Sequence, residues 1–169
     1  MRFFSKLKDI WSHQELRNKI GITLGLILVY RVGSFIVLPG VNSDVLAAQM
    51  DALGGGGLGD ILSLFTGGAF TRASIFALGI MPYISSSIIV QLLTGVSDYF
   101  KNLKSQGETG RAKITQITRY GTVLLATVQG YGLAMGLESS ANLVINPGLF
   151  FKVSTVTTIV AGTIFLMWL

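Results

Sequence analysis

The sequence has 169 residues, of which half are hydrophobic and only 12% are charged, and its mean hydropathy is +0.62. This composition excludes an ordinary soluble domain, in which about a quarter of the residues are charged, and it indicates a membrane protein. The chain contains no cysteine, which excludes disulfides and thiolate metal sites within it, and its net charge is +5.

The first predicted element is a charged segment, residues 1–19, that precedes the first apolar stretch. It is too long and too charged for a cleaved signal peptide, so we expect it to be retained and cytoplasmic. Its large apolar residues recur at helical spacing, which favours an amphipathic helix on the membrane surface over the alternative of a frayed polar tail. These residues are Phe3, Phe4, Leu7, Ile10 and Trp11.

Four apolar stretches are long enough to cross the hydrocarbon core of a membrane, which requires roughly 20 residues. They are residues 20–39, 72–96, 119–137 and 149–169. Because they lack the alternation of barrel strands, we expect transmembrane helices and an all-α, multi-pass bundle. Arg31 lies within the first stretch, where snorkelling to the lipid headgroups explains it at least as well as a role in transport.

The stretch between the first two spans has two parts, a glycine-rich loop at residues 40–59 and a short apolar piece at residues 60–71. The loop contains four consecutive glycines, but no lysine follows them at P-loop spacing, so we interpret it as a flexible tether. The apolar piece is too short to cross the membrane. It is predicted to be a re-entrant segment that dips in from the outside, and a helix lying flat on the outer surface is the alternative.

The second span, residues 72–96, contains Pro82 followed by three serines. Proline removes a backbone donor and would free the carbonyl of Leu78, so we expect a bend within this helix. Branched apolar residues at every fourth position share one face with an amide, and this stripe consists of Ile80, Ile84, Ile88 and Gln91. Such a stripe alone is typical of helix packing, but beside a re-entrant segment it favours the wall of a hydrophobic pore.

The distribution of positive charge predicts the orientation of the spans. Lys and Arg cluster in residues 1–19 and 97–118, and short segments rich in these residues stay in the cytoplasm. Residues 40–59 and 138–148 contain neither and are expected outside. Because insertion and anionic lipid already explain the positive charge, we expect no direct nucleic-acid specificity.

Several motifs, in this order along the chain, resemble the SecY family of bacterial protein-conducting channel subunits. They are RVGSFIVLPG, GGAFTRASIFALGIMPYISSSIIVQLL, GETGRAKITQITRYGT, LVINPGL and GTIFLMWL. The resemblance runs over residues 19–169. It implies a bacterial cytoplasmic membrane protein of ten spans in two pseudo-symmetric halves that open like a clamshell, of which this chain carries the first four spans.

The resemblance also implies roles for particular residues. Ile80 and Ile84 match positions of the pore ring, the hydrophobic gasket around a translocating polypeptide. The re-entrant segment and its hinge match the plug that seals the outer funnel, with Asp60, Ile61, Leu62, Leu64, Phe65, Gly67, Gly68 and Arg72. The lateral gate, where two amides are expected to form a polar cluster, is matched by Met81, Ser85, Ile88, Ile89, Gln91 and Gln129.

The function implied by the resemblance is a passive conduit without a cofactor. Secretory polypeptides thread the pore, and transmembrane segments leave it sideways into the lipid. The expected partners are SecE, SecG, nascent or secretory polypeptides and membrane lipid. Contacts with the ribosome and the SecA motor are expected mainly through loops that this chain does not carry.

Three alternatives compete with the conduit. Half of a solute transporter would place charged groups around a broken helix, whereas the residues near Pro82 are Ile, Met, Tyr and Ser. An intramembrane hydrolase would need a base beside its serine, but the later spans hold no His or Asp, and the lone His13 predicts no metal or acid/base site. The third alternative is a truncated or unfinished multi-pass protein that is itself a client of an insertion machinery.

Overall fold

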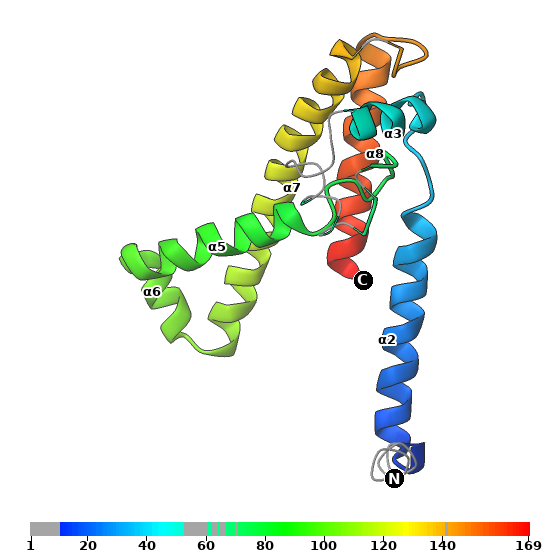
Figure 1. Ribbon diagram of the computed structural model, residues 1–169. Coiled ribbons are helices and arrows are strands. Elements are labelled where there is room, and N and C mark those ends of the chain that lie inside the picture. The colour runs from blue at the N-terminus through cyan, green and yellow to red at the C-terminus, as the bar shows by residue number, and fades with distance from the viewer. Residues whose placement is uncertain (1–10, 53–60, 62–63, 65–66, 70, 141) are drawn as a thin grey trace. The chain divides into compact units, whose positions relative to one another are not determined.

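The computed structural model describes residues 11–52, 61, 64, 67–69, 71–140 and 142–169 (Figure 1). In this part of the chain every regular element is an α-helix, and extended backbone pairs only at two isolated bridges. The all-α class predicted from the sequence is therefore confirmed. The chain divides into two compact units, Met1–Gly33 and Ser34–Leu169.

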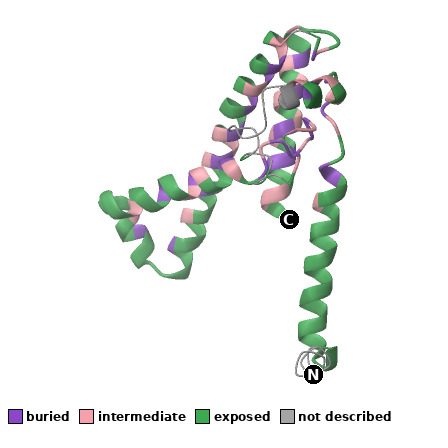
Figure 2. Cartoon of the chain, viewed as in Figure 1, coloured by how far each residue is buried: buried purple, intermediate pink, exposed green. Residues whose placement is uncertain are grey.

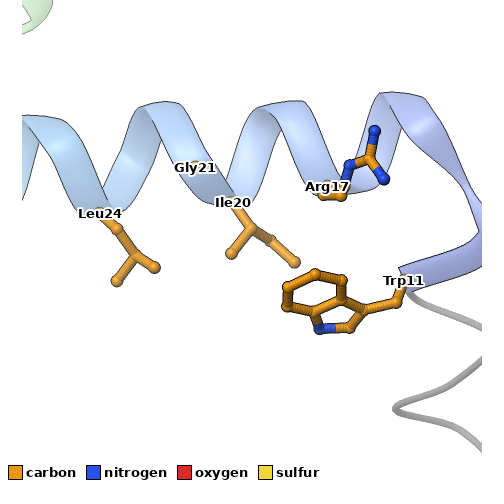
Figure 3. A pocket seen from close by; sticks show the side chains of 5 residues that line it. All are labelled: Trp11, Arg17, Ile20, Gly21 and Leu24. Carbon is orange, nitrogen blue, oxygen red and sulfur yellow. The ribbon is translucent and has the colours of Figure 1, made fainter.

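The first unit contains helix α2 (Gln14–Gly33), whose side chains are almost all exposed (Figure 2). The middle of this helix, residues 20–30, carries no charged residue. Trp11, Ile20 and Leu24 line a shallow apolar cleft of about 180 Å³ at its beginning (Figure 3). A helix that exposes this much apolar surface requires lipid or another protein surface to cover it.

The second unit is built around one long helix. Its helices in the described residues are α3 (Ser43–Ala52), α5 (Met81–Val96), α6 (Asp98–Ser105), α7 (Glu108–Ser139) and α8 (Leu149–Trp168). Helix α7 packs against α5, α6 and α8 (Figure 1). It therefore links the part of the chain that contains the predicted pore wall to the C-terminal helix.

Helix α7 packs through a stripe of small and polar side chains. The stripe recurs every third or fourth residue and consists of Thr118, Thr122, Ala126, Gly130, Ala134 and Leu137. Its first half faces α5, and its second half faces α8, where Ile159 lies against Gly130. Small residues allow helices to approach closely, which is the usual way for helices to associate inside a membrane.

Two stretches of extended chain complete the core beside α8. Residues 36–38 and 73–75 pair as an antiparallel bridge through two backbone hydrogen bonds of 2.8 and 3.0 Å. The Ile75 carbonyl then approaches α8 so closely that a Cβ on Gly162 would overlap it. The rings of Phe76 and Phe165 stack beside this contact, with their centroids 6.0 Å apart.

The second predicted span differs most from the observed helices. Residues 71–80 form turns, and α5 begins only at Met81, because residues 73–75 are held in the bridge and packed on α8. The predicted bend within the helix is therefore wrong. Pro82 lies in the first turn of α5, where a missing N–H costs nothing, and the Leu78 carbonyl accepts the N–H of Met81 at 3.2 Å.

The two segments that the sequence analysis predicted as loops between spans contain helices. Residues 40–59 include α3, and residues 97–118 include α6 and the beginning of α7. The predicted span at 149–169 agrees with α8 to within one residue. Among the described residues, α8 is the one helix both long and apolar enough to cross a bilayer, whereas α5 is apolar but has 16 residues.

Candidate functional site

Helix α5 presents two chemically different faces. Its buried face, which packs against α7, consists of Pro82, Ser86 and Val90. On the opposite side the isoleucines of the predicted stripe are largely exposed, with exposed fractions of 54% for Ile80, 40% for Ile84 and 52% for Ile88. This stripe, which we call the isoleucine face, is therefore only partly covered within the described part of the chain.

A polar contact holds the buried face of α5 against α7. The Ser86 hydroxyl donates a hydrogen bond to the Thr118 backbone carbonyl at 2.8 Å, and the Thr122 hydroxyl donates to the same carbonyl at 2.7 Å. Gly121 leaves room for this contact, since a Cβ there would lie 2.5 Å from the Ser86 Oγ. The crossing of α5 and α7 is therefore centred on a buried hydroxyl group.

The sequence analysis grouped the three serines and did not single out Ser86. A signal was available, because a residue at position 86 falls on the side of a helix opposite the isoleucines at 84 and 88. The partner itself could not be predicted from spacing, because the Thr118 carbonyl lies 32 positions further along the chain.

The predicted ring residues Ile80 and Ile84 lie one turn apart at the start of α5. The Ile80 carbonyl accepts the N–H of Ile84 at 3.0 Å. Ile80 and Tyr83 also form one wall of a cleft of about 290 Å³. The opposite wall comes from the last turns of α8, through Thr163, Leu166 and Met167.

The four predicted gate residues other than the two amides all lie on α5. Met81 and Ser85 are half-buried, whereas Ile88 and Ile89 are exposed. All four are therefore at least partly accessible to an apolar chain or to lipid.

The two predicted gate amides lie on different helices, Gln91 on α5 and Gln129 on α7. Gln91 follows Ser86 toward α6, is exposed, and donates a hydrogen bond from its Nε2 to the Ser87 hydroxyl at 3.3 Å. Gln129 is exposed on α7, beyond Gly121 in the direction of α8. Their place in one polar cluster and their role in a gate stay predictions.

The predicted plug is described only in part. The residues outside the described part are Asp60, Leu62 and Phe65. Ile61 and Leu64 are exposed. Gly67 and Gly68 belong to a turn, with φ values of 60° and 81°, a backbone conformation that favours glycine.

Arg72, at the end of the predicted plug, contacts an aromatic ring. Its guanidinium carbon lies 4.4 Å from the centroid of Phe35, a cation–π arrangement. Its Nη1 is enclosed and has no hydrogen-bond partner among the described residues. The sequence analysis missed Phe35, since nothing in an apolar run identifies which of its side chains meets a distant arginine.

The site consists of apolar side chains and of hydroxyl groups that donate hydrogen bonds to a backbone carbonyl. Within the described residues, no group of three or more His, Cys, Asp and Glu side chains lies close enough to hold a metal ion. The isoleucine face is instead suited to exclude water and ions from a constriction, because branched aliphatic side chains dewet narrow openings.

Comparison with known proteins connects this arrangement to a family. The SecY family model matches residues 74–169. The chain is 49% identical over 158 residues to "Protein translocase subunit SecY" of Escherichia coli strain K12, covering 92% of this chain and 35% of the relative. For the protein of the same name from Vibrio cholerae, identity is 48% over 157 residues, with coverages of 92% and 35%. The chain thus spans about a third of the length of these curated relatives.

Proposed function

Because this chain belongs to the SecY family, we propose that it forms the N-terminal part of the channel subunit of the Sec translocon. The whole subunit would conduct secretory polypeptides across the bacterial cytoplasmic membrane and release transmembrane segments sideways into the lipid. It would act as a passive conduit and catalyse no covalent chemistry. Family membership also removes the main support for the solute-transporter alternative.

The isoleucine face of α5 is the observation that carries this proposal. Ile80, Ile84 and Ile88 are exposed while the opposite face of the same helix is tied to α7 by the Ser86 hydroxyl. A helix that is packed on one face and exposed on the opposite face is suited to line a pore. We propose that Ile80 and Ile84 contribute to the pore ring and that the gate lies along Met81, Ser85, Ile88 and Ile89.

The membrane arrangement that we propose has four spans and a cytoplasmic N-terminus. Helix α8 satisfies the length and hydropathy needed for a span. Helix α2 supports a further span, since its uncharged middle is exposed within its unit. Residues 60–71 would then form the plug, which enters from the outside between the first two spans.

The partners that we propose are those of the translocon. SecE and SecG would bind the membrane part, and nascent or secretory polypeptides would contact the isoleucine face. The ribosome and SecA would bind mainly through regions of the full-length protein that lie outside this chain. Lipid would cover the remaining apolar surface.

Site-specific crosslinking tests the proposal. A photo-crosslinking amino acid at position 84 of the full-length protein, assembled in its complex, is expected to crosslink to a secretory polypeptide stalled in transit. The matched control is position 124, because Leu124 is also exposed but lies on α7. Equal crosslinking from both positions, or none from position 84 in an active complex, would remove Ile84 from the pore ring.

A further inference from the structure

The cleft at the beginning of α2 is formed where the chain turns into this helix. Helix α2 begins at Gln14, and His13, which is not helical, separates it from the residues before it. Figure 3 shows the indole ring of Trp11 beside Ile20, so the ring lies along the first turns of the helix. The cleft therefore occupies the angle between residues 11–13 and α2.

The cleft follows one face of α2 from a charged end to an apolar end. Arg17, Ile20, Gly21 and Leu24 line it and share this face, because they are three or four residues apart. Gly21 has no side chain and forms the floor, where a Cβ would meet nothing within 4 Å. At a rise of about 1.5 Å per residue, the groove changes from charged to apolar over about 10 Å.

Arg17 gives the charged end of the cleft a positive charge that is not neutralised. Its side chain is exposed, and no carboxylate of the described residues lies within ion-pairing distance of it. Lys19 and Glu15 are exposed on the opposite face of the helix. The uncharged residues 20–30 begin directly after Lys19. Such a groove is complementary to a molecule that joins an anionic group to an apolar chain.

We propose that this cleft binds one anionic phospholipid of the cytoplasmic leaflet. Its phosphate accepts hydrogen bonds from the Arg17 guanidinium, whose planar group offers paired donors that suit phosphate. One acyl chain lies over Gly21, between the indole ring and the side chains of Ile20 and Leu24. Tryptophan is typical of the boundary between headgroups and hydrocarbon. The inference rests on the proposed membrane arrangement, in which α2 is the first span and residues 1–19 are cytoplasmic.

Quenching of Trp11 fluorescence by brominated lipid tests the proposal in the full-length protein, assembled in its complex. Two sets of vesicles contain the same amounts of phosphatidylglycerol and phosphatidylcholine, and they differ only in which of the two carries bromine on its acyl chains. Subtracting the spectrum of W11F in the same vesicles isolates the emission of Trp11. We expect a relative affinity about 5-fold higher for phosphatidylglycerol, the effect of one cationic side chain near the membrane surface.

Two matched pairs of variants distinguish the cleft from a general attraction to the membrane. R17Q should lose the preference for phosphatidylglycerol, whereas K19Q removes the same charge from the opposite face and should keep it. G21L fills the floor and should lower quenching by both lipids. G25L should not, because Gly25 also has nothing within 4 Å of its Cβ position but does not line the cleft. Equal losses of preference in R17Q and K19Q, or unchanged quenching in G21L, would overturn the site.

The same measurement separates the lipid site from the proposed membrane arrangement. If the two brominated lipids quench Trp11 equally in the parent protein, the lipid site is wrong and the assignment of α2 as a span stands. If neither lipid quenches Trp11, the proposed position of α2 in the membrane is overturned together with the site.

Discussion

Ser86 and Gly121 form the contact on which the position of α5 depends. The Ser86 hydroxyl reaches the Thr118 carbonyl only because residue 121 has no side chain. Within a membrane such a bond is worth about 0.6 kcal/mol on average. The shape of the contact therefore matters more than its hydrogen bond, because overpacking a close helix crossing costs about 1–3 kcal/mol.

We expect Gly121→Ala to destabilise the protein by about 1–3 kcal/mol, because the new Cβ would lie 2.5 Å from the Ser86 Oγ. The measurement is thermal unfolding of the full-length protein in detergent. The matched control is Gly132→Ala on the same helix, where a Cβ would meet nothing within 4 Å. Adding Ser86→Ala to Gly121→Ala should recover most of the loss. Equal stability of the Gly121→Ala and Gly132→Ala variants would contradict the steric explanation.

Helices α7 and α8 form an antiparallel pair whose loop end is closed by an ion pair. The Lys152 Nζ lies 2.9 Å from a Glu138 carboxylate oxygen, and each side chain is about a quarter exposed, at 25% and 23%. Partial burial reduces screening by salt, but the energy of such a pair at the end of a helix hairpin remains modest. The stripe of small residues on α7 sets the contact between the two helices, and the ion pair adds to it at one end.

A double-mutant cycle should assign about 1 kcal/mol or less of coupling energy to Glu138 and Lys152. Glu138→Gln and Lys152→Gln are each expected to lower the midpoint of thermal unfolding slightly, and the double variant should lose less than the sum of the two. The exchange Glu138→Lys with Lys152→Glu should recover part of the loss. Strict additivity of the two single changes would show that the pair contributes no coupling.

For the whole molecule, the distribution of charge is the basis of the proposed topology. The 13 Lys and Arg residues avoid residues 40–59 and 138–148 completely. Moving positively charged loops across the membrane is unfavourable, and this is the physical basis of the proposed four-span arrangement. The apolar surfaces of α2, α5 and α8 are consistent with it, because water would otherwise contact a large part of all three helices.

We expect a cysteine at Asn142 to react with a membrane-impermeant maleimide added to intact spheroplasts, because residues 138–148 are assigned outside. A cysteine at Lys104, in the basic segment, should react only after the membrane is permeabilised. Both native residues are exposed, so accessibility in the protein is matched. The full-length protein should carry no other reactive cysteine in this experiment. Reaction of the cysteine at position 104 in intact spheroplasts would contradict the proposed orientation.

The sequence by itself determined the helical class, the bounds of α8 and the resemblance to SecY, because hydropathy and motifs are properties of consecutive residues. It also indicated which isoleucines share a face of α5, since that follows from helical periodicity alone. These features could be predicted without knowing what any residue contacts.

Only the tertiary structure decided where α5 begins, which serine ties it to α7 and what Arg72 meets. Residues 73–75 are apolar enough to extend the helix, yet they pair with residues 36–38 and pack beside Gly162. Ser86 and Arg72 each depend on a partner more than 30 positions away along the chain. The local sequence pattern carries no information about such partners. Whether a backbone group forms a helical or a long-range hydrogen bond depends on which distant segment packs beside it.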